Sequence, residues 1–398
     1  MPIAGTTNEY NYQVVRGNDP ATGKPLFQEI VDGLTIANPD DQKTGTITIQ
    51  RPATYGPDTP EKIDQLLQDK KYTDYLPVVL PTLSKVNDML KGTSHKRDEV
   101  IGQMRSTGYW RNRTYTVENI ACAAVMAGCK PSYLPVVLAL ANRKSPAWIT
   151  STHSFAAMAV VNGPIRKEIG MNSGTGALGP FNHANSTIGR AWTILSKCQT
   201  NVGWANTAYM GTTGNSSNYN NLFCAENEEE LPPGWNPLHV QRGFKKEDSV
   251  VTSIGIWDFI QADPSFEWSL LEQLPNCFRK SQMSQAATAI FDPIAADRLY
   301  KEGAKTKEDV SKYVLEKTLI KVKDYWNQSY EIQNFVRPSA MLGQGSMAKY
   351  WTADPESMMP YFARTNNIGV VVVGGGKQQF WQIASGSPST PQSIDAWR

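Results

Sequence analysis

A glycine- and asparagine-rich segment, residues 162–190, constrains the fold of this chain more than any other stretch. Its members are Gly163, Gly170, Gly174, Gly176 and Gly179 with Asn162, Asn172, Asn182 and Asn185. Both residue types favour turns over regular helices and strands, so we expect a loop. No acidic residue occurs between Ile169 and Ala225. Exposed backbone N–H groups far from negative charge favour the binding of an anionic small molecule.

The expected binding site combines this loop with two flanking arginines. Arg166 and Arg190 are expected to neutralise the anion. The glycines at 174, 176 and 179 match G-x-G-x-x-G, but no apolar strand precedes them and no acid follows about 20 residues later, as a dinucleotide fold requires. A tight structural crossing of glycines is the alternative. The expected substrate-binding residues are Asn162, Arg166, Asn172, Ser173, Gly174, Gly176, Asn182, Asn185 and Arg190.

The composition is that of a folded protein without bulk attraction to nucleic acid or membranes. Hydrophobic residues make up 40% of the chain, charged residues 19%, and the net charge is +2. The longest apolar runs, such as Tyr133–Ala141, are too short to span a bilayer. The first residues lack the basic start and apolar core of a signal peptide, and the cysteines are spread out. We therefore expect a cytoplasmic protein.

Apolar periodicity and capping residues predict helices mixed with strands, which indicates an α/β or α+β fold with a mixed sheet. Thr116 is expected to cap a helix that ends at Gly128. Pro131 is expected to begin the next helix, because proline is favoured at a first helical position. A third helix is expected to begin near Asn185 or Ser186.

The same patterns divide the chain into an arm and two domains. We expect an N-terminal arm over residues 1–60, the Gly/Asn-loop domain over 61–262 and a smaller α/β domain over 263–398. Residues 284–326 are expected to be mostly helical. Strands are expected at Gly45–Gln50, Ser249–Phe259 and Gly369–Val373. The arm has too few periodic apolar positions for its own core. The high content of tryptophan and tyrosine suits a subunit interface, so we expect a homo-oligomer.

Cys129 is the expected nucleophile. It lies just ahead of the helix that begins at Pro131 and beside Lys130, and both features lower the pKa of a thiol. The alternative is a small residue buried at a corner between two helices. His183, within the loop, and His239 are expected to act as general acid or base. A lone histidine is more often a structural residue with hydrogen-bond partners.

Glu226 is the remaining catalytic candidate, because the apolar residues 222–225 place its side chain at the start of a pocket wall. The chain has no C-x-x-C and no H-E-x-x-H, so no metal ligand is assigned; a site made of His, Asp and Glu stays open, and the cofactor is unknown. A second glycine loop, Gly374–Gly376 with Lys377, follows the expected strand at 369–373 directly. That position is typical of ligand loops, although the loop lacks the Walker spacing.

Three segments carry a resemblance to a known family. They are TVENIACAAVMAGCKPSYLPVVLAL, VNGPIRKEIGMNSGTGALGPFNHANSTIGRAW and FCAENEEELPPGWNPLHVQRGF. They resemble bacterial proteins that accompany, or are fused to, the UGSC selenocysteine/cysteine domain, over roughly residues 83–250. The Sec/Cys-Gly-Ser-Cys motif of that domain is absent here. The resemblance therefore implies a companion part, with thiol-linked small-molecule chemistry by association.

Three functions stay open at this point. The first is an oligomeric enzyme that acts on a small anionic or polar metabolite, with Cys129 as the reacting thiol. The second is an acid/base or metal-dependent lyase or hydrolase that uses Glu226 and His239. The third is a non-catalytic subunit that docks a thiol or selenol protein.

Overall fold

The computed structural model describes residues 17–19, 21–35, 37, 54–104, 113–147, 154–200, 213–262, 265, 267–281, 285–376 and 379–398. Within them, helices combine with mixed sheets, which confirms the expected α/β or α+β class. The strand expected at Gly45–Gln50 and the residue Lys377 lie outside the described residues. Among the helices that the structure describes, none is long and apolar enough to cross a membrane.

Two four-stranded sheets form the centre of the molecule, and they share one pairing pattern. In each sheet a central strand pairs with one parallel and one antiparallel neighbour, and a fourth strand pairs antiparallel at the edge. The first sheet has the order β12 (Gln392–Ser393), β5 (Val250–Ile256), β3 (Ala156–Asn162) and β4 (Leu222–Ala225). The second has the order β10 (Ile368–Val372), β7 (Ala287–Phe291), β11 (Trp381–Ser385) and β6 (Phe259–Ala262).

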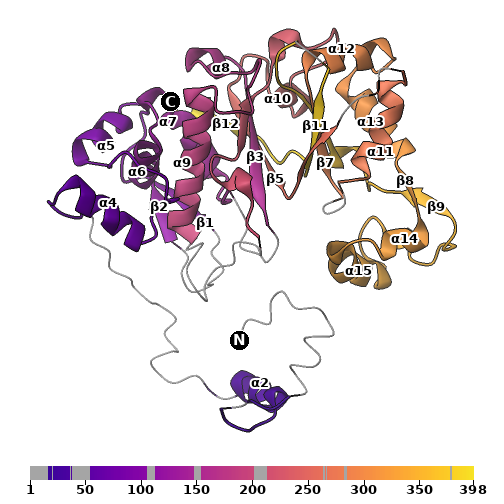
Figure 1. Cartoon of the computed structure of the whole chain (residues 1–398), viewed down its shortest axis with the longest axis horizontal. Coiled ribbons are helices and arrows are strands. Elements are labelled where there is room, and N and C mark those ends of the chain that lie inside the picture. The colour runs from indigo at the N-terminus through magenta and orange to yellow at the C-terminus, as the bar shows by residue number, and fades with distance from the viewer. Residues whose placement is uncertain are drawn as a thin grey trace.

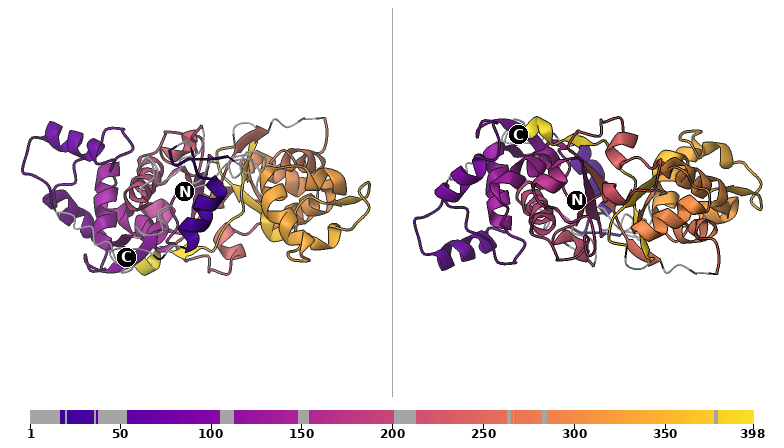
Figure 2. Two further views of the ribbon diagram at one scale, coloured as in Figure 1. Left: turned by 90° about the horizontal axis from the view of Figure 1, so that it is seen from below. Right: turned by 90° about the horizontal axis from the view of Figure 1, so that it is seen from above.

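Alternation along the strands places the two sheets face to face. In β3, Ala157, Ala159 and Val161 pack in a cluster with helices, whereas Met158 and Val160 pack with residues of the second sheet. Successive side chains of a strand point to opposite faces, so each sheet contributes to two cores. The result is a helix–sheet–sheet–helix arrangement, seen from the front in Figure 1 and from below and above in Figure 2.

The two sheets exchange their edge strands. The chain passes from β5 of the first sheet into β6 of the second, and from β11 of the second sheet into β12 of the first. The two crossings touch, because a Cβ atom on Gly386 would lie 2.0 Å from the carbonyl oxygen of Gly255. Each of the expected domains, 61–262 and 263–398, therefore lends a strand to the sheet of the other.

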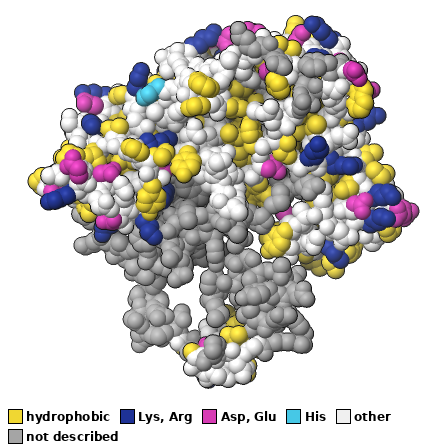
Figure 3. Space-filling model, viewed as in Figure 1, with side chains coloured by type: hydrophobic (Ala, Val, Ile, Leu, Met, Phe, Trp, Pro, Cys, Tyr) yellow, Lys and Arg dark blue, Asp and Glu magenta, His cyan; other side chains and the backbone are white. Residues whose placement is uncertain are grey.

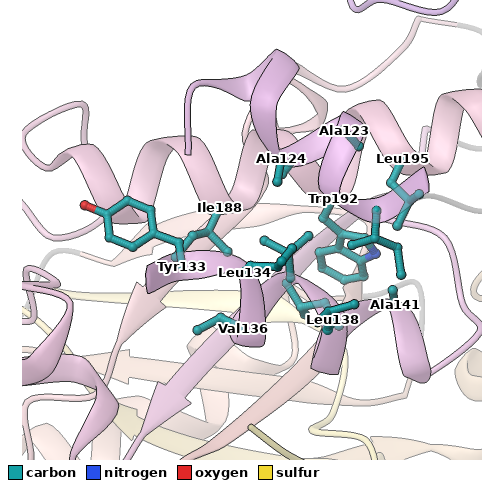
Figure 4. Close-up of a cluster of buried hydrophobic side chains, with 14 of the residues drawn as sticks. Ala123, Ala124, Tyr133, Leu134, Val136, Leu138, Ala141, Ile188, Trp192 and Leu195 are labelled. Atoms are coloured by element: carbon teal, nitrogen blue, oxygen red, sulfur yellow. The ribbon is translucent and has the colours of Figure 1, made fainter. Parts of the chain in front are cut away.

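The outer layer of the first sheet confirms the helix boundaries expected from capping. Its helices include α5 (Leu83–Leu90), α6 (Val117–Ala127), α7 (Leu134–Asn142) and α9 (His183–Thr200). Thr116 accepts a hydrogen bond from the N–H of Asn119 in a capping box, and Gly128 ends α6 in the left-handed conformation. The third expected helix, α9, begins slightly earlier than predicted, at His183. Figure 4 shows Leu134, Leu138 and Trp192 packed in this layer.

The outer layer of the second sheet holds α11 (Leu270–Phe278), α12 (Pro293–Lys301) and α13 (Lys307–Lys317). Thr306 caps α13 as expected, by accepting from the N–H of Asp309. The prediction that residues 284–326 are mostly helical is wrong for 287–291, which form the central strand β7. A short apolar run is compatible with a buried strand or a buried helix, and only its neighbours decide.

The structure describes further α-helices and two strand pairs. They are α2 (Leu26–Thr35), α4 (Pro60–Asp69), α8 (Ile165–Glu168), α10 (Leu238–Gln241), α14 (Val322–Trp326), α15 (Arg337–Met341) and the strand pairs β1 (Val100–Met104) with β2 (Arg113–Thr116) and β8 (Leu319–Lys321) with β9 (Met358–Pro360). On the face shown in Figure 3, basic and acidic side chains are interspersed. This distribution agrees with the small net charge.

Candidate functional site

The carboxyl ends of four strands meet where the two sheets touch. Asn162 ends β3, Glu226 follows β4, Asp292 follows β7, and Gly374–Gly376 lies just beyond β10. The sheets are linked here by a hydrogen bond from the N–H of Asn227 to the carbonyl oxygen of Val372, 2.8 Å. Ligands of open α/β sheets bind outside the carboxyl ends of the strands, so this is the first place to look for a site.

Glu226 is an internal anchor and not an exposed acid. Its side chain is fully buried and pairs with Lys307 at 2.5 Å. Its carboxylate also accepts from Asn162 Nδ2 and the N–H of Leu238, both at 2.7 Å, and from the N–H of Val372 at 3.2 Å. A buried carboxylate with four donors has little capacity left for a substrate. The role expected for Glu226 in a pocket wall gains no support from this geometry.

Both expected anion-binding arginines are occupied by protein groups. Buried Arg166 pairs with Glu228 at 2.9 Å and with Glu229 at 3.1 Å. Arg190 holds Asp74 through two hydrogen bonds of 2.8 and 2.9 Å. Bidentate carboxylate pairing uses the fork of donors that an incoming anion would need. The expectation that these arginines neutralise a substrate gains no support from this geometry.

The asparagines of the Gly/Asn loop hold the loop in shape. Asn172 Oδ1 accepts from the N–H of Gly174 at 2.9 Å, and Asn182 Oδ1 accepts from the N–H of Asn185 at 3.1 Å. Asn185 Nδ2 donates to the carbonyl oxygens of Asn172 and Ala177 at 2.8 and 3.1 Å. These side chains hold the backbone of the loop in place.

The two glycine loops that the sequence singles out separately lie against each other. The N–H of Gly374 donates to the carbonyl oxygen of Ser173 at 2.8 Å, and Asn227 Nδ2 donates to the carbonyl oxygen of Gly374 at 2.9 Å. A Cβ atom on Gly375 would lie 2.0 Å from Thr175 Oγ1. Only glycine permits so close an approach. We call residues Ser173–Gly176 and Gly374–Gly376 the double glycine loop.

The double glycine loop carries backbone N–H donors that have no acceptor in the described part of the chain. The N–H groups of Ser173, Thr175, Gly176, Gly375 and Gly376 have no acceptor among the residues that the structure describes. None of these residues is fully buried. Clustered N–H groups of this kind form a concave site for an anion or a polarised oxygen.

Asp292 lies beside the double glycine loop, and it is not among the site residues expected from the sequence. A Cβ atom on Gly374 would lie 3.8 Å from the Cβ of Asp292. Burial raises the pKa of Asp292, while hydrogen bonds from the N–H groups of Ala295 and Phe380 oppose this rise. The sequence does mark this position, because Asp-Pro follows an apolar run. An aspartate with proline directly after it is typical of an N-cap and the first helical position.

The structure overturns the acidity expected of Cys129. The residue does lie just ahead of the short helix that begins at Pro131. Burial nevertheless raises the pKa of its thiol to about 12, and a hydrogen bond with Thr187 opposes the rise only in part. Desolvation penalises the thiolate more than the helix start and Lys130 favour it.

The two histidines occupy contrasting places. His183 is exposed at the start of α9, and its ring centroid lies 5.9 Å from that of Tyr133. His239 is fully buried on α10, and neither ring nitrogen has a hydrogen-bond partner among the described residues. Among the described residues, no hydrogen bond joins either histidine to the double glycine loop. In the described ranges, no group of three or more His, Cys, Asp and Glu side chains is placed to hold a metal ion.

Comparison with known proteins adds no assignment. No protein-family model, no curated protein and no solved structure matches the chain. The resemblance to proteins associated with the UGSC domain therefore stays an expectation from the sequence.

Proposed function

We propose that the chain is an enzyme that acts on a small anionic or polar metabolite at the double glycine loop. The observation that carries the proposal is the contact between Thr175 and Gly375, which brings unused backbone N–H groups of two loops together. Such donors stabilise a carboxylate, a phosphate or the oxyanion that develops on a carbonyl group. The substrate class is thus a small metabolite with one of these oxygens.

Asp292 moves the proton in this proposal. Its raised pKa keeps part of the population protonated closer to neutral pH than an ordinary aspartate. Proton transfer beside stabilised oxygen is the common element of many lyases, isomerases and hydrolases. The acid/base class is therefore retained, with Asp292 in place of the expected pair Glu226 and His239.

Thiol catalysis at Cys129 is not part of the proposal, because its thiol is held far from the ionised form. We place the enzyme in a reducing compartment, the cytoplasm, since none of the described cysteines is held in a disulfide. Association with a thiol or selenol protein, which the UGSC resemblance implies, is compatible with this site and not required by it. A homo-oligomer stays our expectation for the assembly.

A binding experiment tests the oxygen-binding role. Inorganic phosphate and acetate are titrated into the full-length chain by calorimetry. Gly375→Ala introduces a Cβ at 2.0 Å from Thr175 Oγ1, so we expect at least a tenfold loss of affinity. Gly33→Ala is the matched control, because nothing lies within 4 Å of its Cβ. Equal affinities in the two variants would remove the double glycine loop as the site.

A conversion experiment tests the role of Asp292. The protein is incubated with a mixture of small carboxylic acids and phosphate esters, and the products are followed by mass spectrometry. Asp292→Asn keeps the N-cap of α12 but holds no exchangeable carboxyl proton. We expect turnover to fall about 100-fold or more with anion binding retained. Unchanged turnover would exclude Asp292 as the acid or base.

A further inference from the structure

A second cluster of buried polar side chains lies at the opposite ends of the strands. Gln285 stands just before β7, and Asn367, just before β10, donates to its carbonyl oxygen at 3.0 Å. The double glycine loop lies beyond the carboxyl ends of the same strands, so the two places are separate. The cluster consists of Asp258, Gln285, Tyr325, Gln328, Glu331 and Tyr361, and we call it the acid–tyrosine cluster.

Two fully buried tyrosines form the centre of the acid–tyrosine cluster. Tyr361 and Glu331 both contribute to a raised pKa of Tyr325, and Glu331 also contributes to a raised pKa of Tyr361. The hydroxyl of Tyr361 donates to the carbonyl oxygen of Ser281 at 3.2 Å. The side chain of Gln285 lies beside the hydroxyl of Tyr325, but not in hydrogen-bonding geometry. These residues come from segments far apart along the chain, so only the tertiary fold assembles them.

Several polar atoms of the cluster are buried without a partner among the described residues. They are Glu331 Oε2, Asp258 Oδ1, Gln328 Oε1, Gln285 Nε2, the hydroxyl of Tyr325 and the neighbouring Ser281 Oγ. Ser281 and Tyr325 are fully buried. Buried polar groups are nearly always hydrogen-bonded in folded proteins, so a concentration of exceptions calls for an external partner.

All of these atoms except Gln285 Nε2 can accept a hydrogen bond, and two carboxyl groups, those of Asp258 and Glu331, lie among them. Asp258 comes from the crossing between β5 and β6, and Glu331 precedes the π-helical turn Ile332–Val336. Arg279 is the cation that acts on Tyr361, but it is exposed and donates to the carbonyl oxygen of Leu319 at 3.4 Å. Single π-helical turns within helices are frequent at functional sites.

Burial raises the pKa values of the acids in this cluster. Burial raises the pKa of Glu331 to about 7. Burial also raises the pKa of Asp258, although hydrogen bonds from Ser385 oppose this. Burial raises the pKa of Tyr361, and the nearby Asp258 and Glu331 add to the rise. A bound cation would offset the cost of ionising both carboxyl groups.

We propose that the acid–tyrosine cluster is a second binding site, specific for a small ligand that carries an ammonium group. The N–H donors of the ligand would meet the free oxygens of Glu331, Asp258 and Gln328, which lack donors within the described protein. The rings of Tyr325 and Tyr361 supply additional cation–π attraction. An anionic ligand would face two carboxyl groups instead, which excludes it from this site.

Calorimetric titration of the full-length chain with ethylammonium, ethanol and acetate tests the proposal. These probes have similar size and carry a positive, a neutral and a negative head. We expect ethylammonium to bind with a Kd on the order of 1 mM, which is near the limit for so small a ligand. Ethanol and acetate should bind at least tenfold more weakly. The affinity for ethylammonium should fall between pH 8 and pH 6, because Glu331 takes up a proton.

Glu331→Gln should weaken ethylammonium at least tenfold. Glu356→Gln is the matched control, because Glu356 is exposed and pairs with Lys321 and Lys323. Should Glu331→Gln fail to fold, Tyr325→Phe keeps the ring, removes one unpartnered hydroxyl and should weaken binding several-fold. The proposal is overturned by binding of ethanol or acetate as tight as that of ethylammonium. It is equally overturned by no binding of ethylammonium, or by unchanged affinity in the cluster variants.

Discussion

Glu226 and Lys307 form a fully buried ion pair, 2.5 Å between Oε1 and Nζ, that joins the end of β4 to the first residue of α13. The pair therefore connects the first sheet to the helical layer of the second. Breaking a buried pair leaves an uncompensated charge, which costs about 3–5 kcal/mol. We expect Lys307→Met to lower the free energy of unfolding in urea by this amount. A loss below about 1 kcal/mol would contradict the anchoring role.

The double variant Glu226→Gln/Lys307→Met supplies the control for this pair. It removes both charges together, so much of the lost stability should return. If the double variant is as unstable as the single one, hydrogen bonds to Asn162, Leu238 and Val372 dominate, and the ion pair is secondary.

The strand exchange predicts unequal effects at two neighbouring glycines. Gly386 has a φ of 142°, and its Cβ would meet the carbonyl oxygen of Gly255 at 2.0 Å. We expect Gly386→Ala to lower the free energy of unfolding by about 3 kcal/mol, because it adds a clash to a strained backbone. Gly255→Ala is the matched control, since its Cβ would meet nothing within 4 Å. Similar losses in both variants would argue against close contact between the crossings.

The raised pKa of Glu331 should make the stability of the folded chain depend on pH. Its pKa is about 7 in the folded chain and 4.5 in the unfolded reference. The folded state therefore holds a proton that the unfolded state has lost, and this contribution to stability disappears as the pH rises from 4.5 to 7. The melting temperature of Glu331→Gln should rise relative to the parent across this interval. A constant difference would show that Glu331 has an ordinary pKa.

We expect the thiol of Cys129 to be alkylated slowly. Because burial holds the pKa of its thiol at about 12, iodoacetamide should react with it more slowly than with a free thiol of pKa about 8.5. Peptide mass spectrometry after labelling at several pH values gives the rate for this cysteine alone. Thr187→Ala should slow the reaction further, since it removes the hydrogen bond that favours the thiolate. Rapid labelling at pH 7 would restore the thiol to the list of catalytic candidates.

We expect the N-terminal arm, residues 1–60, to take part in the assembly of the protein. Within it, helix α2 has no buried residue, and Phe27 and Leu34 are 59% and 81% exposed. Such an apolar face is unfavourable in water and is typical of a contact surface. We expect deletion of residues 1–50 to lower the oligomeric mass in light scattering or to cause precipitation. Phe27→Ser/Leu34→Ser should have the same effect without shortening the chain. An unchanged mass in both would exclude an interface made by the arm.

Local chemistry explains what the sequence could predict. Helix ends at Thr116, Gly128 and Thr306 depend on contacts within a few residues, so capping rules located them. The strand at 369–373 was recognised from its apolar run, whereas β7 was predicted as helix. An isolated apolar run of five residues does not specify its partner strands, and β7 is a strand because β10 and β11 flank it.

The sequence by itself determined that both glycine loops exist and that the first is free of acidic residues. Only the tertiary structure decided that Gly375 lies on Thr175, because their contact spans two hundred residues of chain and depends on how the two sheets meet. The same holds for charge. The sequence presents Arg166 and Arg190 as available cations, and the fold supplies Glu228 and Asp74 as their partners. Contacts between distant segments occupy charged side chains that the sequence alone presents as available. They also bring together side chains such as Glu331 and Tyr361, which no sequence pattern connects.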